Sequence, residues 1–184
     1  MKPRGGKAAR TALTGMLGAL ALTLSFLESL IPPLPFLPPG AKPGLSNLAV
    51  LYAASALGAG PAFLLVGLKA LFALVTRGMT AGLMSFAGGL LSTAGMVLLL
   101  RCRGVGLVGV GVCGGVLHNL GQLLGAMLLT KTAALVFYLP LLIVFGAAFG
   151  LITGLVSHMT LPFLQKQIQR AFPPADSDTK EPKP

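Results

Sequence analysis

The 184-residue chain is 54% hydrophobic and only 10% charged, with a mean hydropathy of +0.86. A soluble domain carries about a quarter charged residues, so this chain has too little polar surface to cover a globule in water. Its formal net charge of +10 does not indicate nucleic acid, because the basic residues gather at the ends of apolar runs and form no stripe with aromatic residues. The composition therefore predicts an all-α, multi-pass membrane protein with a single membrane domain and excludes a nucleic-acid partner.

Six apolar segments, separated by glycine, proline and basic residues, predict a bundle of six transmembrane helices within residues 11–161. The expected helices cover residues 11–31, 45–57, 61–75, 81–100, 105–129 and 134–161, and Pro140 is expected to kink the last of them. A basic segment, residues 1–10, precedes the first helix, which is too long for a signal-peptide core and lacks an A-x-A cleavage site. Residues 162–184 are expected to form a cytoplasmic tail that is partly disordered.

A proline-rich stretch, IPPLPFLPPGAKPG, joins the first two expected helices. Its six prolines prevent a regular helix, so residues 32–44 should form a stiff loop, which is either a lid over a binding site or a plain connector. With both termini in the cytoplasm, ten basic residues face inward and three face outward, namely Lys42, Arg77 and Lys131. This asymmetry predicts a protein of the cytoplasmic membrane, embedded in the lipid bilayer, whose proline-rich loop faces outward.

Three polar side chains interrupt the apolar segment 105–129: His118, Asn119 and Gln122. At about 100° per residue, they share one side of a helix with Gly111 and Gly115. Polar groups at membrane depth need partners, because water is scarce there. Two alternatives follow, a hydrogen-bonded network between helices or the wall of a ligand pocket.

A single lysine, Lys69, lies near the middle of the apolar segment 61–75. At that depth its ammonium group should face a partner, a cavity or a ligand. The structural alternative is an ion pair with Glu28, the only carboxylate outside the C-terminal tail. The functional alternative is an anionic group of a ligand.

Further polar residues lie close to the proline-rich loop. Ser46 or Asn47 could cap the second expected helix, which is the common role of such residues, or Asn47 could point into an outer pocket. Lys42 and Arg77 lie toward the outer surface, either as solvated charges or as a source of positive potential at a pocket mouth.

Catalytic and metal-binding patterns are missing from the sequence. The stretch GPAFLLVGLKA lacks the spacing and the hydroxyl residue of a phosphate-binding loop, so ATP hydrolysis is not expected. No aspartate-rich pair could hold Mg²⁺ against a diphosphate, and neither GxSxG nor HExxH occurs. We therefore expect no catalytic residue, no metal and no cofactor, and a protein that is not an enzyme.

Small residues recur at a spacing of four along two of the expected helices, and this spacing lets helix backbones approach closely. Gly111 and Gly115 show it on the segment 105–129, where packing within the bundle is the favoured interpretation. Gly15 and Ala19 show it on the first helix, where the sequence leans toward a docking face for a partner protein.

The stretches LSFLESLIPPLPFLPPGAKPGLSNLAVLY, FAGGLLSTAGM and GVLHNLGQLL together resemble the Gx transporter family, often labelled heptaprenyl diphosphate synthase component I. The resemblance covers about residues 12–160 and is carried by two motifs. The first is K-x-G-L-x-N, formed by Lys42, Gly44, Leu45 and Asn47. The second is H-N-x-x-Q, formed by the three polar residues of segment 105–129.

This resemblance implies a substrate-binding S component of an energy-coupling factor transporter. Such proteins are six-helix bundles with an outward ligand site under the first loop, and they work with a transmembrane coupling protein and two ATPase subunits. Their first helix commonly carries an A-x-x-x-A docking motif, which Ala8 and Ala12 match here, whereas Gly15 and Ala19 replace it one to two turns later.

The leading hypothesis is therefore a membrane-embedded, substrate-binding subunit of an uptake transporter, with an anionic or mixed polar small molecule as substrate. The expected pocket residues are Glu28, Lys42, Asn47, Lys69, His118, Asn119 and Gln122. One alternative is a membrane accessory subunit for isoprenoid diphosphate synthesis. Prenyl diphosphate synthases use aspartate-rich Mg²⁺ sites, and both aspartates of this chain lie in its tail, so a synthase as such is disfavoured. Another alternative is a structural membrane partner that binds no ligand.

Overall fold

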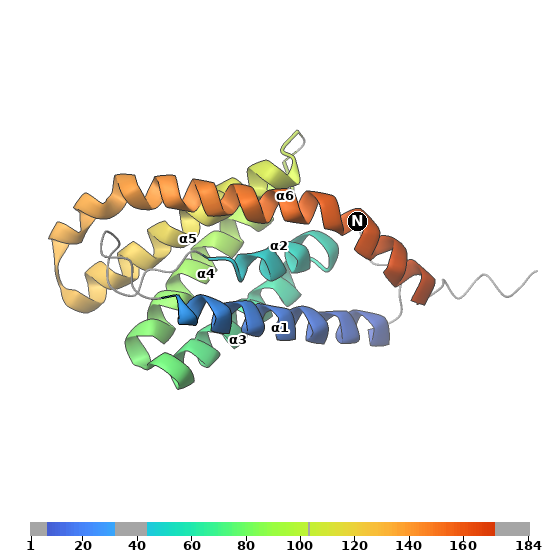
Figure 1. Cartoon of the computed structure of the whole chain (residues 1–184), viewed down its shortest axis with the longest axis horizontal. Coiled ribbons are helices and arrows are strands. Elements are labelled where there is room, and N and C mark those ends of the chain that lie inside the picture. The colour runs from blue at the N-terminus through green and yellow to red at the C-terminus, as the bar shows by residue number, and fades with distance from the viewer. Residues whose placement is uncertain (1–6, 32–43, 103, 172–184) are drawn as a thin grey trace, which may run out of the picture.

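The structure, a computed structural model, describes residues 7–31, 44–102 and 104–171, with side chains between residues 8 and 166. Within these residues the chain is helical throughout (Figure 1). The helices are α1 (Lys7–Leu30), α2 (Asn47–Ala56), α3 (Ala59–Arg77), α4 (Met79–Leu99), α5 (Leu107–Thr130) and α6 (Leu139–Ala171), with a short 3-10 helix, η1 (Ala133–Tyr138), before the last. The expected all-α architecture is therefore present.

Five of these helices are long and apolar enough to cross a bilayer. Their outer surfaces carry large apolar side chains that water would not tolerate in such number. The most exposed are Phe137, Leu128, Val75, Met159, Met16 and Phe163. The described part of the chain is thus a multi-pass helical membrane protein.

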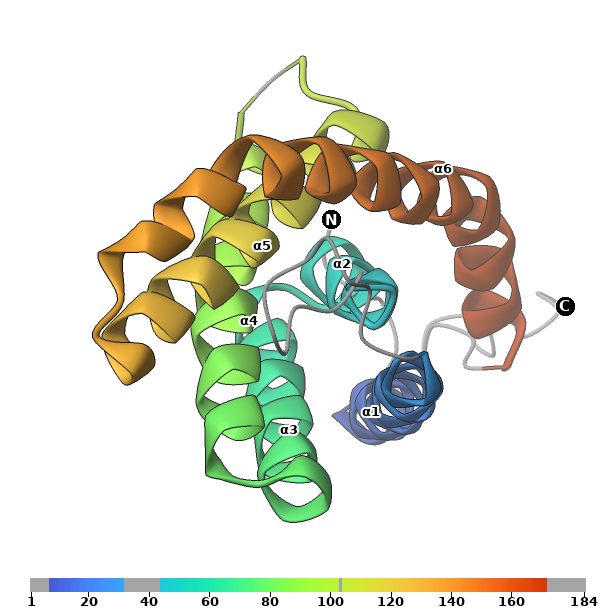
Figure 2. The same ribbon diagram turned by 60° about the vertical axis from the view of Figure 1, so that its left-hand side comes forward.

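The short helix α2 forms the centre of the bundle (Figure 2). It has 10 residues, a length of roughly 15 Å, which is half the thickness of a bilayer core. Seven of its residues are buried, and it contacts every long helix. Tyr52 of α2 also hydrogen-bonds Thr160 of α6. The expected span over residues 45–57 is therefore a core helix rather than a full crossing of the membrane.

Glycines bring α4, α5 and α6 into backbone contact. A Cβ atom added at Gly115 of α5 would lie 2.1 Å from the carbonyl oxygen of Gly146 in α6, and one added at Gly121 would lie 2.6 Å from the carbonyl oxygen of Ala87 in α4. No side chain fits at such distances, so only glycine allows this packing. The packing role expected for the glycines of the segment 105–129 is confirmed.

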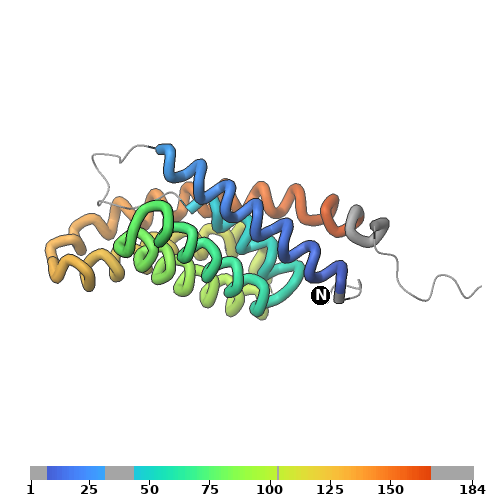
Figure 3. Tube along the Cα trace, turned by 90° about the horizontal axis from the view of Figure 1, so that it is seen from below, coloured from blue at the N-terminus to red at the C-terminus, as the bar shows by residue number. Residues whose placement is uncertain are grey.

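One residue, Gly78, forms the whole connection between α3 and α4. Its φ of 89° lies in the left-handed region, where a Cβ atom would clash with the backbone. This glycine ends α3 through a bond from its N–H to the carbonyl of Leu74 and starts α4 directly. The two helices are therefore held antiparallel and adjacent (Figure 3).

The last two elements differ from the expected single helix over residues 134–161. The 3-10 helix η1 ends at Tyr138, so Pro140 lies in the first turn of α6, where its missing N–H costs no hydrogen bond. The proline within the helix is Pro162. The helix runs on to Ala171, ten residues beyond the expected end, and residues 172–184 of the expected tail lie outside the described residues.

The bundle has two ends that differ in chemistry. The first turns of α1 and the last turns of α6 lie at one end, which we call the terminal end (Figure 1). At the other end α1 finishes and α2 begins, so this end, which we call the loop end, holds the attachment points of the proline-rich loop. Apart from Gly44, the loop itself lies outside the described residues. Most of the polar residues singled out in the sequence lie in the loop-end half.

Candidate functional site

A small polar cavity lies inside the loop-end half of the bundle, with a volume of about 20 Å³. This volume suffices for about one water molecule. Five elements contribute to its wall, and eight of its ten lining side chains are polar or charged. The polar ones are Ser25, Glu28, Ser46, Lys69, Arg77, Ser85, His118 and Gln122; the others are Ala81 and Met84.

The carboxylate of Glu28 joins the end of α1 to the start of α2. Its Oε1 accepts the backbone N–H of Ser46 at 3.2 Å, and its Oε2 accepts the Ser46 hydroxyl at 3.1 Å. Both residues are buried, at 4% and 2% exposure. Charge-assisted hydrogen bonds of this kind are about twice as strong as neutral ones, so the pair fixes the two anchor points of the proline-rich loop relative to each other.

The side chain of Lys69 in α3 extends to α2 and not to the membrane–water interface. Its side chain is 2% exposed, and its Nζ donates to Oδ1 of Asn47 at 2.9 Å. Ser46 lies at the N-cap position of α2 but makes no side-chain cap bond. The expectation that Ser46 or Asn47 caps this helix is therefore wrong, because Glu28 and Lys69 take the two side chains instead.

The glycine of the K-x-G-L-x-N motif packs directly on the polar cluster. Gly44 has a φ of +82°, and a Cβ atom there would lie 3.0 Å from both Asn47 Nδ2 and His118 Cδ2. A larger residue would be strained in its backbone and would also push the cluster apart. This contact connects the two motifs of the sequence in space, although Lys42 of the first motif lies outside the described residues.

His118 and Gln122 of α5 form a second pair in the cavity wall. Gln122 Nε2 lies 3.1 Å from His118 Nε2, and both side chains are buried. Gly88 of α4 makes room for them, because a Cβ atom there would lie 2.8 Å from Gln122 Cγ. The pair is thus held between α4 and α5 and faces the charged residues of α1 and α3 across the cavity.

Asn119 faces a different helix from His118 and Gln122. Its Nδ2 donates to the backbone carbonyl of Leu142 in α6 at 2.9 Å, and it does not line the cavity. Gly111 and Gly115, which the helical wheel placed with the polar residues, also pack on α6. The polar trio is therefore divided: Asn119 braces two helices, as the first alternative expects, whereas His118 and Gln122 line a small cavity.

We expect Asn119→Ala to lower the free energy of unfolding by about 1 kcal/mol, the size of a hydrogen bond between membrane helices. Thermal unfolding of the detergent-purified protein measures this loss. Binding at the cavity should not change, since Asn119 does not line it. A loss of ligand binding at unchanged stability would contradict this assignment.

Arg77, which the sequence placed toward the outer surface as a solvated charge or at a pocket mouth, lines the cavity. It lies two turns after Lys69 on the same side of α3, and Glu28 interacts electrostatically with both cations. A spacing of eight residues on one helix could have indicated this arrangement. Ser25 and Ser85 were also missed, because single serines in apolar helices carry no distinguishing pattern. The described residues contain no cluster of three metal-ligating side chains.

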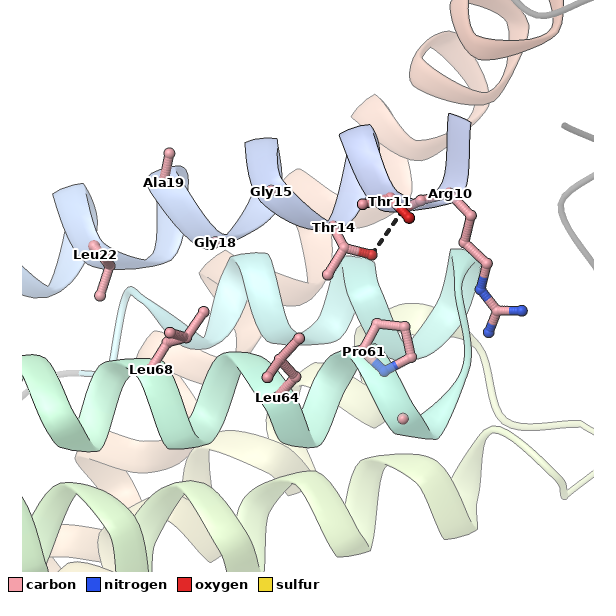
Figure 4. A pocket seen from close by; sticks show the side chains of 11 residues that line it. Arg10, Thr11, Thr14, Gly15, Gly18, Ala19, Leu22, Pro61, Leu64 and Leu68 are labelled. Carbon is pink, nitrogen blue, oxygen red and sulfur yellow. Dashed lines mark hydrogen bonds between the residues drawn. The ribbon is translucent and has the colours of Figure 1, made fainter. Parts of the chain in front are cut away.

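A second hollow runs along the outside of the bundle between α1 and α3, with a volume of about 670 Å³ (Figure 4). The hollow exists because several of the α1 residues that line it are small. At Gly15, for example, no atom lies within 4 Å of an added Cβ atom. Gly15 and Ala19 line this α1–α3 groove, opposite Leu64 and Leu68 of α3. Ala8 and Ala12 lie on exposed positions of α1 outside the groove.

Comparison with known proteins gives one positive result. A family model described as heptaprenyl diphosphate synthase component I matches residues 17–160. This match confirms the family resemblance carried by the two motifs and spans α1 to α6. No curated protein and no solved structure matches the chain.

Proposed function

This chain belongs to the heptaprenyl diphosphate synthase component I family, and from that premise we propose that it is the substrate-binding S component of an energy-coupling factor type uptake transporter. In this proposal the chain binds a small molecule and catalyses no reaction. A transmembrane coupling protein and ATPase subunits supply the energy.

The buried polar cavity is the observation that carries the proposal. A helical bundle with a purely structural role would be expected to avoid buried charges, because each charged side chain at membrane depth costs about 3 kcal/mol. Here Glu28, Lys69 and Arg77 converge on one cavity together with His118 and Gln122. Convergent polar groups in an otherwise apolar protein are typical of a ligand site. Asn47 would position Lys69, and Asn119 would hold α5 against α6 outside the cavity.

We place both termini in the cytoplasm and the loop end outside, as the positive-inside rule favours. The cavity then opens toward the outer side, close to the attachment points of the proline-rich loop and therefore close to Lys42 in the chain. A substrate would enter from outside, and release would require the bundle to change its orientation or shape. The terminal end would face the ATPase subunits.

The outer surface of α1 is our proposed docking surface for the coupling protein. Ala8, Ala12, Gly15 and Ala19 follow one another every three or four residues, and all four are exposed. Small residues at this spacing allow a partner helix to approach the backbone closely. The α1–α3 groove widens this surface at Gly15 and Ala19.

Affinity purification of the full chain from native membranes tests the proposal. We expect a transmembrane coupling protein and ATPase subunits to copurify in stoichiometric amounts. Their reproducible absence, under detergent conditions that preserve other membrane complexes, would argue against an S component.

We expect Ala19→Leu to reduce copurification of the coupling protein about tenfold, because a larger side chain on the exposed surface of α1 would hold a partner helix away from the α1 backbone. The matched control is Ala94→Leu, which adds the same atoms to an exposed position of α4. Quantitative immunoblotting of the purified complex measures both. Equal losses for the two variants would show that this surface of α1 is not special.

The family description itself favours a second candidate, a membrane accessory subunit of isoprenoid diphosphate synthesis. Glu28 is the only acidic residue among the described ones, so Mg²⁺-dependent chemistry would have to reside in a partner. This candidate predicts a stable complex with a soluble prenyl synthase and a higher activity of that enzyme. Copurification of the synthase without any ATPase would favour it over the transporter.

A further inference from the structure

The charges around the polar cavity do not cancel. Lys69 and Arg77 are cations, Glu28 is an anion, and the other described lining residues are neutral side chains or His118. With the amide nitrogen of Gln122 facing it, His118 Nε2 fits the role of acceptor in a neutral imidazole. Among the described lining residues, two positive charges, one of them on the half-buried Arg77, and one negative charge leave one net positive charge at the cavity. Such a charge is costly unless a partner of opposite sign joins it.

The wall of the cavity also limits the shape and polarity of a ligand. Apart from Ala81 and Met84, every described lining side chain is polar, and the imidazole of His118 is the one aromatic ring among them. A flat ring would find no Phe, Tyr or Trp among the described lining residues to stack on. A prenyl chain would find little apolar surface here. Its binding would depend on such surface, because burial of each methylene group contributes about 0.8 kcal/mol. A diphosphate would bring two or more negative charges to a site that compensates one.

We propose that the cavity takes a small hydrophilic monoanion, of the class of hydroxylated monocarboxylates. This inference rests on the proposed function, since it names the substrate class of the same site. The ligand carboxylate takes the place of Asn47 Oδ1 as the acceptor for Lys69 and also faces Arg77. Ligand hydroxyl groups bond to His118, Gln122 and Ser85. Because the cavity has room for only about one water molecule, binding requires the long Lys69 side chain to move.

Thermal stabilisation of the full chain in an uncharged detergent tests the charge rule. The probes are glycerate (one negative charge), malate (two), glycerol (none), ethanolamine (one positive) and farnesyl diphosphate. We expect glycerate to stabilise the protein at about tenfold lower concentration than malate, because only the monoanion neutralises the site. Glycerol and ethanolamine should have no effect at the same concentrations.

Substitution of Glu28 provides a gain-of-preference experiment. Glu28→Gln replaces the carboxylate by an amide, whose oxygen can still accept from Ser46, and raises the net charge of the described cavity residues from one to two. Malate should then become the better probe, again by about tenfold. Arg77→Gln lowers the net charge to zero and should abolish the preference of glycerate over glycerol. Asn119→Ala, which removes a buried amide outside the cavity, is the control and should keep the wild-type order.

Each other result overturns the inference. Stabilisation of the wild-type chain by malate or farnesyl diphosphate in preference to glycerate would do so, as would the absence of any effect of glycerate. An unchanged order of probes in both charge variants would also contradict it. The proposed function is judged separately, because copurification with a coupling protein and an ATPase does not depend on which probe binds.

Discussion

Replacement of Gly115 by alanine is expected to cost at least about 3 kcal/mol of unfolding free energy, or to prevent assembly of the bundle. The new Cβ atom would lie 2.1 Å from the carbonyl oxygen of Gly146 and 2.9 Å from the Cα of Gly150. Both are backbone atoms of α6, so no side-chain rotation can relieve the overlap. α5 and α6 would have to separate along their whole contact, and the Asn119–Leu142 bond would stretch with them.

Gly15→Ala provides the matched control for this substitution. It makes the same chemical change in a membrane helix, but no atom lies within 4 Å of the new Cβ. Since alanine favours helix over glycine by up to about 1 kcal/mol, this variant should be as stable as the wild type or slightly more so. Thermal unfolding of both variants in the same detergent measures the difference. A Gly115→Ala protein with wild-type stability would mean that α5 and α6 do not meet as the structure has them.

Features set by neighbouring residues could be predicted from the sequence. Apolar length located all six helices, and Gly78 lay between the two segments that it separates. The expectation that Lys69 faces a partner or a cavity also followed from its place in an apolar run, and its burial agrees. Each of these features depends only on residues that are close together along the chain, and their order can be seen directly in the sequence.

Features set by the arrangement of helices could not be predicted. Nothing local in the α2 sequence says that it lies at the centre of the bundle, since uniform apolarity fits lipid and core equally. Neighbouring positions on a helix differ by about 100°, so His118 and Asn119 face different helices, and the wheel could not tell which. The pairing of Glu28 with Ser46 required two segments on either side of the proline-rich loop to be placed in space.

Replacement of Lys69 by methionine should separate the two alternatives that the sequence left open for this residue. If Lys69 binds an anionic ligand, Lys69→Met should weaken stabilisation by glycerate at least about tenfold, since one of the two cations is lost. The unfolding free energy itself should lie between a loss of about 0.5 and a gain of about 2 kcal/mol relative to the wild type. Loss of the Asn47 bond costs roughly 1.5–3 kcal/mol, and relief of a buried charge returns roughly 2.5–3.5 kcal/mol.

A purely structural Lys69 predicts the opposite pattern. If its main role were an ion pair that holds Glu28, its removal would leave a buried carboxylate uncompensated and would cost about 3–5 kcal/mol. Arg77 argues against that outcome, because it faces the same cavity and leaves Glu28 with an opposite charge when Lys69 is gone. Asn119→Ala completes the comparison, since it should lose stability and keep binding. A Lys69→Met protein that keeps stability and loses binding, beside an Asn119→Ala protein that does the reverse, would assign one polar residue to the ligand and the other to the fold.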